Sequence, residues 1–379
     1  MWWTEARVVV ADGLPARYDG ARMAERDIQD LGQAALEAWC IAQGEAPYRA
    51  RQVLAWVHRR GVARFQDMAN LPLRLRARLT EDFHVGRLEP AAMSLADDGT
   101  RKMVFHLPAA PAGDGRPAAV ESVLIPQLDR PDGARDRLTL CISSQAGCGM
   151  GCGFCATAAL GLVRNLRPAE IVGQVRFAQT LAAPERLTNV VLMGMGEPLA
   201  NYEAVVTALE LLTAEWGYAI SPRRITVSTV GLAPEIPRFI AETRVNLAVS
   251  LHAPTDRQRE RLVPVNRRYP LAVLLQACRD VPLPRRKRIT FEYVMLAGEN
   301  DTDTDAHALV TLLHGLRAKV NLIPWNAFPG AAFTPSPRSR VLRFQDILRQ
   351  HRLTATIRES RGGDIQAACG QLAAARPAA

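Results

Sequence analysis

The stretch Cys148-Gly-Met-Gly-Cys152-Gly-Phe-Cys155 holds three of the seven cysteines of the chain within eight residues. Three thiolates at this spacing can converge on one soft metal centre, and the glycines between them permit the tight turns of such a loop. A structural zinc site or an ordinary iron–sulfur cluster takes four protein ligands. Three therefore predict a cluster with one iron open to a small molecule, and the alternative is a zinc knuckle whose fourth ligand is a distant Cys or His.

Downstream and upstream of this loop, short β-branched stretches alternate with amphipathic ones from Leu138 onward. The predicted strands are 138–143, 189–194, 224–229, 245–250, 288–294 and 319–323, and the helical stretches between them include 168–182, 201–216 and 303–318. Six βα units predict an α/β fold with a parallel sheet curled into a partial or full barrel, and place the site at the carboxyl ends of the strands.

The N-terminal part shows a different pattern. Residues 1–28 have no clear periodicity and are predicted to be an extension, whereas 29–95 have the pattern of a small helical domain. In PYRARQVLAWVHRRG a buried stripe around Val53 and Val57 contrasts with the surrounding arginines. Single arginines usually lie on a solvated helix face, but together they are candidates for phosphate contacts. The arginines in question are Arg49, Arg51, Arg59, Arg60, Arg74, Arg76 and Arg78.

Between the two parts, 101–107 and 120–126 alternate as two strands joined by the Pro/Gly-rich PAAPAGDGRP. They predict a β-hairpin extension and linker over 96–136, with the barrel over 137–372 and a tail over 373–379. Glu121 stands in the second strand, where on its own it is most simply a solvent-facing carboxylate.

Composition limits the possible partners and the compartment. The chain has 379 residues, 48% of them hydrophobic, and a net charge of +9, which favours a polyanion such as nucleic acid over a membrane. No apolar run approaches the roughly 18 residues of a membrane span. The cysteines are clustered and do not have the spacing of a secreted disulfide framework. They therefore predict a reducing, cytoplasmic location.

Several longer segments narrow the interpretation. They are CISSQAGCGMGCGFCATAALGLVRNLRPAEIVGQV, LMGMGEPLANY, ITVSTVGLAP, LAVSLHAP, LVPVNRRYP and RGGDIQAACGQL. From about Asp30 to Leu372 the chain resembles the RlmN/Cfr family of radical S-adenosylmethionine (SAM) enzymes, which methylate adenine bases in RNA. The resemblance implies a partial (β/α)6 barrel, a [4Fe-4S] cluster held by Cys148, Cys152 and Cys155, and SAM as cosubstrate.

The resemblance also implies a set of SAM contacts on the barrel rim. These residues are Gly196, Glu197, Ser228, Ser250, Leu251, His252 and Asn326. From the residues alone, Gly194 and Gly196 allow a close backbone approach and Glu197 can pair with an amine, whereas a single Ser or His at a strand end is more often a turn residue.

Two further cysteines acquire roles only through the family. The resemblance implies that one SAM methylates Cys369, that a second is cleaved to a 5′-deoxyadenosyl radical, and that the activated methyl group joins protein to adenine. Glu121 then accepts a proton, and Cys141 resolves the adduct through a transient disulfide with Cys369. On sequence alone either thiol could be an inert core residue. Cys40 and Cys278 receive no role.

The C-terminal ESRGGDIQAACGQL looks closer to the RlmN branch, which methylates carbon 2 of an adenine in large-subunit rRNA and often in tRNA, than to the Cfr branch, which methylates carbon 8. The expected partners are therefore rRNA, tRNA and an electron donor such as flavodoxin or ferredoxin, with the protein acting as a monomer. The rival functions are a radical SAM enzyme acting on a non-RNA substrate and a non-catalytic RNA-binding protein with a structural metal.

Overall fold

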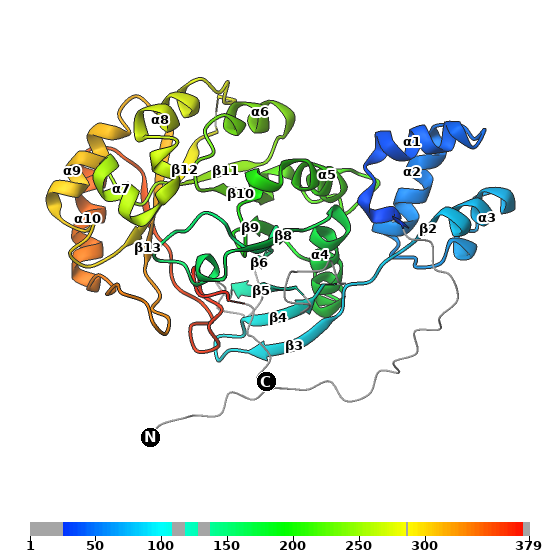
Figure 1. Cartoon of the computed structure of the whole chain (residues 1–379), viewed down its shortest axis with the longest axis horizontal. Coiled ribbons are helices and arrows are strands. Elements are labelled where there is room, and N and C mark those ends of the chain that lie inside the picture. Colours follow the sequence, from blue (N-terminus) through cyan, green and yellow to red (C-terminus); the bar gives the residue numbers. More distant parts are fainter. Residues whose placement is uncertain (1–25, 108–117, 128–136, 286, 374–379) are drawn as a thin grey trace.

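The computed structural model describes residues 26–107, 118–127, 137–285 and 287–373, and centres on a curved sheet of ten strands in the order β14-β13-β12-β11-β10-β9-β6-β5-β4-β3 (Figure 1). Neighbours from β6 to β14 all pair in parallel. These strands are β6 (Arg137–Cys141), β9 (Asn189–Leu192), β10 (Ile225–Thr229), β11 (Asn246–Ser250), β12 (Ile289–Met295), β13 (Ala318–Pro324) and β14 (Ala355–Ile357). All six predicted strands are present, and β14 is an additional one.

Helices cover the outer surface of the parallel strands (Figure 1). They are α4 (Pro168–Ala182), α5 (Tyr202–Thr213), α6 (Glu235–Glu242), α7 (Asp256–Leu262), α8 (Leu271–Arg279), α9 (Asp303–Leu312) and α10 (Arg338–Gln350). Capping sets where they begin: Pro168 starts α4, and a reciprocal Thr302–Asp305 capping box starts α9. The predicted helix over 303–318 ends early, because Ala318 already begins β13. The α/β partial-barrel prediction is confirmed.

The antiparallel strands continue the same sheet. β3 (Pro90–Leu95) pairs with β4 (Arg101–His106), β4 with β5 (Ala119–Gln127), and β5 with β6. The predicted pairing of 101–107 with 120–126 therefore exists, but it is fused to the barrel rather than set apart from it. The connection predicted between them, 108–117, lies outside the described residues, as do residues 1–25, 128–136 and 374–379.

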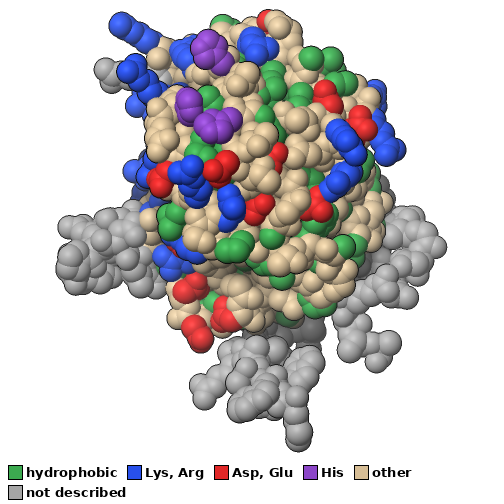
Figure 2. Space-filling model, turned by 90° about the vertical axis from the view of Figure 1, so that its left-hand side faces the viewer, with side chains coloured by type: hydrophobic (Ala, Val, Ile, Leu, Met, Phe, Trp, Pro, Cys, Tyr) green, Lys and Arg blue, Asp and Glu red, His purple; other side chains and the backbone are tan. Residues whose placement is uncertain are grey.

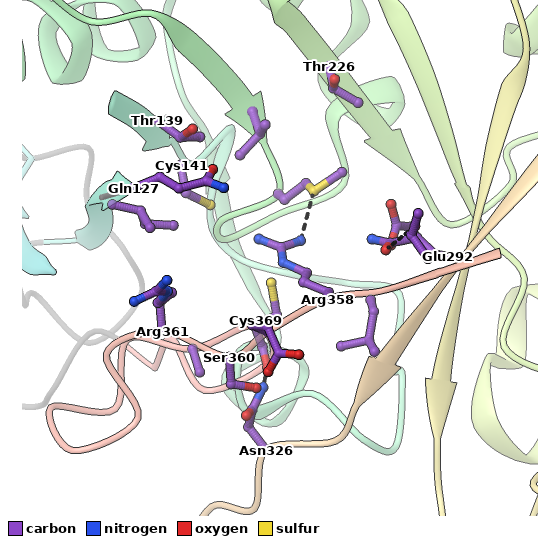
Figure 3. A pocket seen from close by; sticks show the side chains of 18 of the residues that line it. Gln127, Thr139, Cys141, Thr226, Glu292, Asn326, Arg358, Ser360, Arg361 and Cys369 are labelled. Carbon is purple, nitrogen blue, oxygen red and sulfur yellow. Dashed lines mark hydrogen bonds between the residues drawn. The ribbon is translucent and has the colours of Figure 1, made fainter. Parts of the chain in front are cut away.

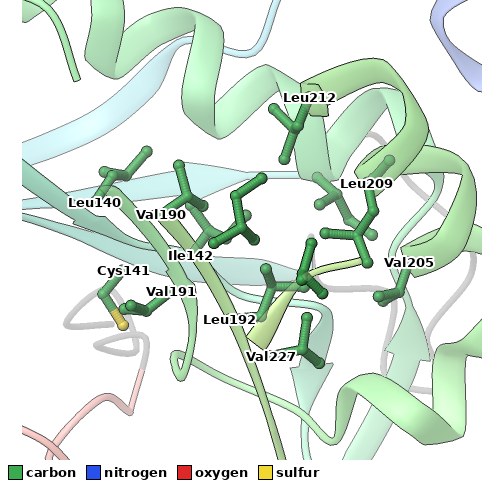
Figure 4. Close-up of a cluster of buried hydrophobic side chains, with 14 of the residues drawn as sticks. Leu140, Cys141, Ile142, Val190, Val191, Leu192, Val205, Leu209, Leu212 and Val227 are labelled. Carbon is green, nitrogen blue, oxygen red and sulfur yellow. The ribbon is translucent and has the colours of Figure 1, made fainter. Parts of the chain in front are cut away.

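Alternation along the strands separates the core from the barrel interior. In Figure 4, Leu140 and Val190 lie on the side of α5, among Leu209 and Leu212, whereas Cys141 is turned to the opposite side of the sheet. Successive strand residues face opposite sides, so an apolar Leu140 fixes an inward Cys141. The core thus positions one of the predicted catalytic thiols.

A small helical domain packs beside the barrel (Figure 1). It contains α1 (Gln33–Ala42), α2 (Tyr48–Leu54), α3 (Leu73–Asp82), and the paired strands β1 (Arg26–Asp27) and β2 (Phe83–His84). Its first described strand therefore lies within the range predicted as an extension. Short helices and turns complete the chain: η1 (Ile28–Asp30), η2 (Ala55–Arg59), η3 (Phe65–Asp67), η4 (Ala156–Leu160), η5 (Pro198–Asn201), η6 (Pro222–Arg224) and η7 (Pro264–Arg267).

The arginines of this domain do not all remain available to a ligand. Val53 and Val57 are buried as predicted, and Arg51, Arg59, Arg60, Arg74 and Arg78 are exposed. Arg76 differs, because its guanidinium donates to the carbonyl oxygens of Leu71, Gln66 and Ala69. Its expected role as a phosphate contact is wrong in this conformation, since its donors already hold a loop.

The opposite face of the barrel, formed around α9 and α10, carries cationic, anionic and histidine side chains close together (Figure 2). On that face, for example, Asp303 pairs with both Arg340 and Arg343. Mixed signs give no single-sign field for a polyanion. In the described residues, no helix is long and apolar enough to cross a bilayer.

His58, between the small domain and the barrel, predicts a pH effect on stability. Its ring is buried, stands 5.8 Å from that of Tyr218, and has no hydrogen-bond partner among the described residues. Burial, with a smaller contribution from Arg176, lowers its pKa to about 3. An unfolded histidine titrates near 6.5, so from there down to about pH 3 only the unfolded chain takes up this proton. The unfolding free energy that neutral His58 contributes above pH 6.5 is therefore lost progressively as the pH falls toward 3.

We expect His58→Leu to reduce the loss of unfolding free energy between pH 6 and pH 5 by about 1 kcal/mol, close to the limit of about 1.4 kcal/mol per pH unit for one proton. Urea titrations at pH 7, 6 and 5 measure this slope. His314→Leu, at an exposed position, controls for the loss of a histidine as such. Equal slopes for wild type and His58→Leu would contradict the assignment.

Candidate active site

The predicted cluster loop leaves the paired strands β7 (Gln145–Gly147) and β8 (Leu162–Asn165) and is tied to the barrel by its backbone. Cys148 N–H donates to Gly161 O at 2.8 Å, Gly153 N–H donates to Leu262 O at 3.1 Å, and the Trp325 indole donates to Phe154 O at 3.0 Å. The loop is therefore held in place from two sides by residues far away in the sequence.

The three thiols of this loop are half-buried, free and close enough to affect one another. Burial raises the pKa of Cys148 to about 11, and it raises that of Cys152 further, with the charges of Cys155 and Cys148 adding to the effect. Three thiolates so close together are thus unfavourable without a cation between them. Thiolates are the ligands that an iron–sulfur cluster requires. Among the described residues, no three His, Cys, Asp or Glu side chains lie close enough together to hold a single metal ion. An iron–sulfur cluster does not require this, because its ligands bind different irons.

The C-terminal segment carries Cys369 directly beside this loop. Gly370 O accepts from Ala156 N–H at 2.8 Å, and Leu372 O accepts from the Thr157 hydroxyl at 2.5 Å. Asn326 donates to Cys369 O at 3.2 Å. The residue after Cys369 is therefore bonded to the residue after Cys155, two positions that are more than 200 apart in the sequence.

Cys369 and Cys141 line one cavity of about 670 Å³ inside the barrel (Figure 3). Burial, followed by the charge of Cys369, raises the pKa of Cys141 to about 12. Asn326 and Arg358 also line this cavity, as does Glu292 of β12. The structure thus brings together the two cysteines to which the family resemblance assigns catalytic roles. They lie beside a space that can admit a ligand.

Glu121 contacts the same segment from β5. It is buried, it accepts from Ala373 N–H at 2.9 Å, and it lies 3.3 Å from the Lys102 ammonium. The expectation from residues alone, a solvent-facing carboxylate, is therefore wrong, because β5 is covered by the C-terminal segment rather than by water. Its placement beside the residues that follow Cys369 agrees with a role near that thiol.

The loop after β9 carries Gly196 and Glu197. A Cβ at Gly196, where φ is +98°, would lie 2.5 Å from Cβ of Gln145, and one at Gly194 would lie 2.7 Å from Ile142 O. Glycine at both positions thus lets the loop lie against Gln145 and Ile142, where a side chain would not fit. The Glu197 carboxylate accepts from Val230 N–H at 2.7 Å and Leu199 N–H at 3.0 Å.

Burial raises the pKa of Glu197 to about 7, against the opposing effect of its hydrogen bonds, chiefly the one from Val230. Among the described residues no cation contributes to this pKa, so an added ammonium group would stabilise the carboxylate. Its environment is therefore suited to the amine of a ligand, which is the role that the resemblance implies for it.

The remaining rim residues lie at the carboxyl ends of adjacent strands. Ser228 and Ser250 are half-buried on β10 and β11, and Leu251 is buried. His252 accepts from Val294 N–H at 3.1 Å through Nδ1 and packs edge-on against Phe154 at 4.6 Å. Burial, then Arg259, lowers the pKa of His252 to about 3, so its ring is neutral. Of the seven predicted SAM contacts, only Asn326 lines the cavity that holds the two thiols.

Arg259, on α7, joins two of these rim loops, and no sequence pattern indicated this role. Its guanidinium is fully buried and donates to Val230 O at 2.6 Å, Ser250 O at 3.1 Å and Leu251 O at 3.1 Å. A fourth bond reaches Asn266 Oδ1 at 2.9 Å. One arginine thus sets the spacing of the loops after β10 and β11.

We expect Arg259→Met to lower the free energy of unfolding by about 3–5 kcal/mol, because it leaves several buried acceptors without a donor. The midpoint of urea unfolding measures this loss. Arg257→Met, on the exposed side of the same helix, is the matched control. A difference below about 1 kcal/mol between the two variants would show that water replaces the guanidinium, contrary to our expectation.

Sequence reasoning also missed Arg358 and Glu292. Glu292 is the single acid in ITFEYVM, a strand whose seven residues are all buried, and that isolation was a usable signal. Arg358 stands in IRESRGGD with another arginine nearby, and nothing in the pattern separates the two. Only the fold shows that Arg358 lies inside the barrel and Arg361 is exposed.

Comparisons with known proteins agree with this geometry. Residues 142–310 match the radical SAM superfamily, and 26–85 match the N-terminal domain of ribosomal RNA large subunit methyltransferases. Dual-specificity RNA methyltransferases RlmN from Desulfosudis oleivorans and Anaeromyxobacter dehalogenans are each 48% identical to this chain, over 92% of it and 91% and 92% of their own lengths. A radical SAM methyltransferase structure from Sphaerobacter thermophilus superposes with a TM-score of 0.80 at 45% identity, covering 93% of this chain and all of that one. The chain therefore belongs to the RlmN family of radical SAM RNA methyltransferases.

Proposed function

We propose that this protein methylates carbon 2 of an adenine in large-subunit rRNA, and in tRNA as a second substrate, through a methylated Cys369. The observation that carries the proposal is the hydrogen bond from Ala156 to Gly370, which places Cys369 beside the cluster loop, together with the cavity that Cys369 shares with Cys141. A non-RNA radical SAM enzyme would need neither of these thiols nor a basic N-terminal domain.

Cys148, Cys152 and Cys155 would hold a [4Fe-4S] cluster, which when bound supplies the electron for reductive cleavage of SAM. Around it, Glu197 receives the amine of SAM, and the strand ends carrying Ser228, Ser250 and Asn326 position the rest. Gly196, Leu251 and His252 are the remaining proposed SAM contacts.

The protein's own thiols and carboxylate carry the remaining steps. Cys369 accepts a methyl group as a thiolate. After a 5′-deoxyadenosyl radical takes a hydrogen atom from that methyl group, its carbon forms a bond to adenine, and the adduct loses one electron, which the cluster when bound would accept. Glu121 takes the proton that the base releases; to do so it must part from Lys102 or share it. The Cys141 thiolate then attacks the Cys369 sulfur: the disulfide forms as the sulfur–carbon bond breaks, and the electron pair leaves with the carbon on the base, which takes up a proton from solvent to complete the methyl group. An external reductant must then open the disulfide.

The small helical domain, expected over 29–95, would hold the RNA by its backbone. Exposed Arg59 and Arg74 are available for phosphates, which position RNA without reading its sequence, and Arg51 and Arg78 would also have to leave their carboxylate partners Glu37 and Glu81. An acidic electron carrier such as flavodoxin or ferredoxin would reduce the cluster. We place this activity in the cytoplasm and in a monomer.

Nucleoside mass spectrometry tests the function. Protein reconstituted anaerobically with iron and sulfide is incubated with an unmodified large-subunit rRNA transcript, SAM and a reducing system, and the RNA is digested. We expect 2-methyladenosine, and none with Cys148→Ala, which removes one cluster ligand. Formation of 8-methyladenosine would assign the chain to carbon 8, and the absence of any methyladenosine would overturn the proposal.

A further inference from the structure

Arg358 is a charged side chain inside the catalytic cavity to which the mechanism above gives no part. It follows β14, where its backbone N–H donates to Leu322 O at 2.9 Å, and its Nη1 lies 3.5 Å from Met193 Sδ. In Figure 3 its guanidinium extends into the cavity between the side chains of Cys369 and Cys141. A cation is therefore held among the two reacting thiols.

At these positions, the charges of Arg358 and of the two thiols affect one another. The negative charge of a Cys369 thiolate is the largest influence on Arg358 and raises its pKa; burial opposes it, and Glu292 and Cys141 add to it. In the reverse direction, Arg358 lowers the pKa of Cys141, against burial and against the charge of Cys369. The two thiolates thus repel each other and share one counter-charge.

Other charged groups also face the cavity, from several elements. They are Arg137 of β6, Glu292 of β12, Lys319 of β13, and Glu359 and Arg361 of the C-terminal segment. Glu292 is already bonded to Asn321 at 2.8 Å. Of the cavity's cations, Arg358 is the one that acts on Cys141 in the described structure.

We propose that Arg358 is a positioning residue whose guanidinium is the counter-charge shared by the two cysteines: it stabilises negative charge on Cys369 before methyl transfer, and on Cys141 after it. This inference rests on the proposed function of Cys369 as methyl acceptor. It assigns the order in which the two thiols become reactive to a single shared cation.

The charges change in step with the chemistry. Cys369 first loses its proton to solvent; its sulfur then forms a bond to the methyl carbon of SAM, the bond from that carbon to the sulfonium breaks, and the electron pair stays on S-adenosylhomocysteine. Cys369 becomes a neutral thioether. The charge that opposed ionisation of Cys141 has then gone, and Arg358 is released to Cys141. Cys141 therefore becomes nucleophilic only when it has an adduct to resolve.

Alkylation of each thiol tests the proposal. Protein is expressed in iron-limited medium and loaded with its cluster anaerobically, before any SAM is added, so that Cys369 carries no methyl group, as peptide mass confirms. Iodoacetamide labelling at pH 8 is then followed over time by peptide mass spectrometry. We expect Arg358→Gln to slow alkylation of Cys369 by at least about fivefold, and Arg358→Lys, which keeps the charge, to stay within about twofold of wild type. Arg352→Gln, at an exposed position that does not line the cavity, is the matched control.

A second measurement leaves Arg358 intact and so decides the matter even if Arg358→Gln does not fold. Cys369→Ala removes the competing charge, and we expect Cys141 to be alkylated at least about threefold faster at pH 9 than in wild type. An unchanged rate, or a rate for Cys369 in folded Arg358→Gln equal to that of wild type, overturns the proposal. An Arg358→Lys variant as slow as Arg358→Gln also overturns it, because only a structural role would be left. No measurement here contains SAM or RNA, so failure of RNA methylation and failure of this inference are distinguishable.

Discussion

A Cys369→Ala variant is expected to lose RNA methylation by at least about 10³-fold while keeping its iron–sulfur cluster. The sulfur of Cys369 would carry the methyl group to the base. In the variant, Cys141 is the one described thiol that still lines the cavity. Cys141 cannot substitute, because its burial raises its pKa to about 12 and β6 fixes it on the other side of the cavity.

The measurement combines product formation with a count of methyl groups on the protein. Wild-type protein exposed to SAM should gain about 14 Da on the peptide that contains Cys369, and the variant should gain none, with the iron content of both unchanged. Cys278→Ala is the matched control, since Cys278 is a buried thiol of α8 outside the site. Methylation by Cys369→Ala within tenfold of wild type would exclude a methyl-cysteine intermediate.

The catalytic elements differed in how far sequence could predict them. The spacing of Cys148, Cys152 and Cys155 was enough to predict a cluster loop, because the three proposed ligands lie within one turn-forming stretch. The six barrel strands were predictable for a similar reason, since period and length are local properties. The resemblance placed Cys369 and Cys141 in catalysis, but no local pattern distinguishes them from Cys40 or Cys278, which are also free thiols.

The parts that could not be predicted are long-range contacts. Glu121 was expected to face solvent because an acid in an alternating strand usually does, and the covering segment comes from the far end of the chain at Ala373. Arg76 and Arg259 illustrate the same limit: each is one arginine among several on a helix, and its role depends on carbonyl oxygens of other segments. Side-chain role is set by tertiary contacts, which local periodicity does not encode.

Cys141→Ala is expected to have the second large effect, on release rather than on attachment. Without Cys141, the bond between Cys369 and RNA forms but no described thiol of the cavity remains to break it. A covalent protein–RNA species should therefore accumulate toward one per protein, and release of methylated RNA should fall by at least about 10²-fold.

Denaturing gel electrophoresis of labelled RNA detects this species as a slow band that survives heat and detergent and disappears after protease treatment. The outcome separates two readings of the buried thiol. If Cys141 were only core packing, as its position on β6 beside Val191 allows, Cys141→Ala would behave as Cys278→Ala does: slightly less stable, with normal release and no slow band. A slow band that also needs Cys369, and is absent from the Cys141→Ala/Cys369→Ala double variant, assigns bond formation to one side of the cavity and bond cleavage to the other.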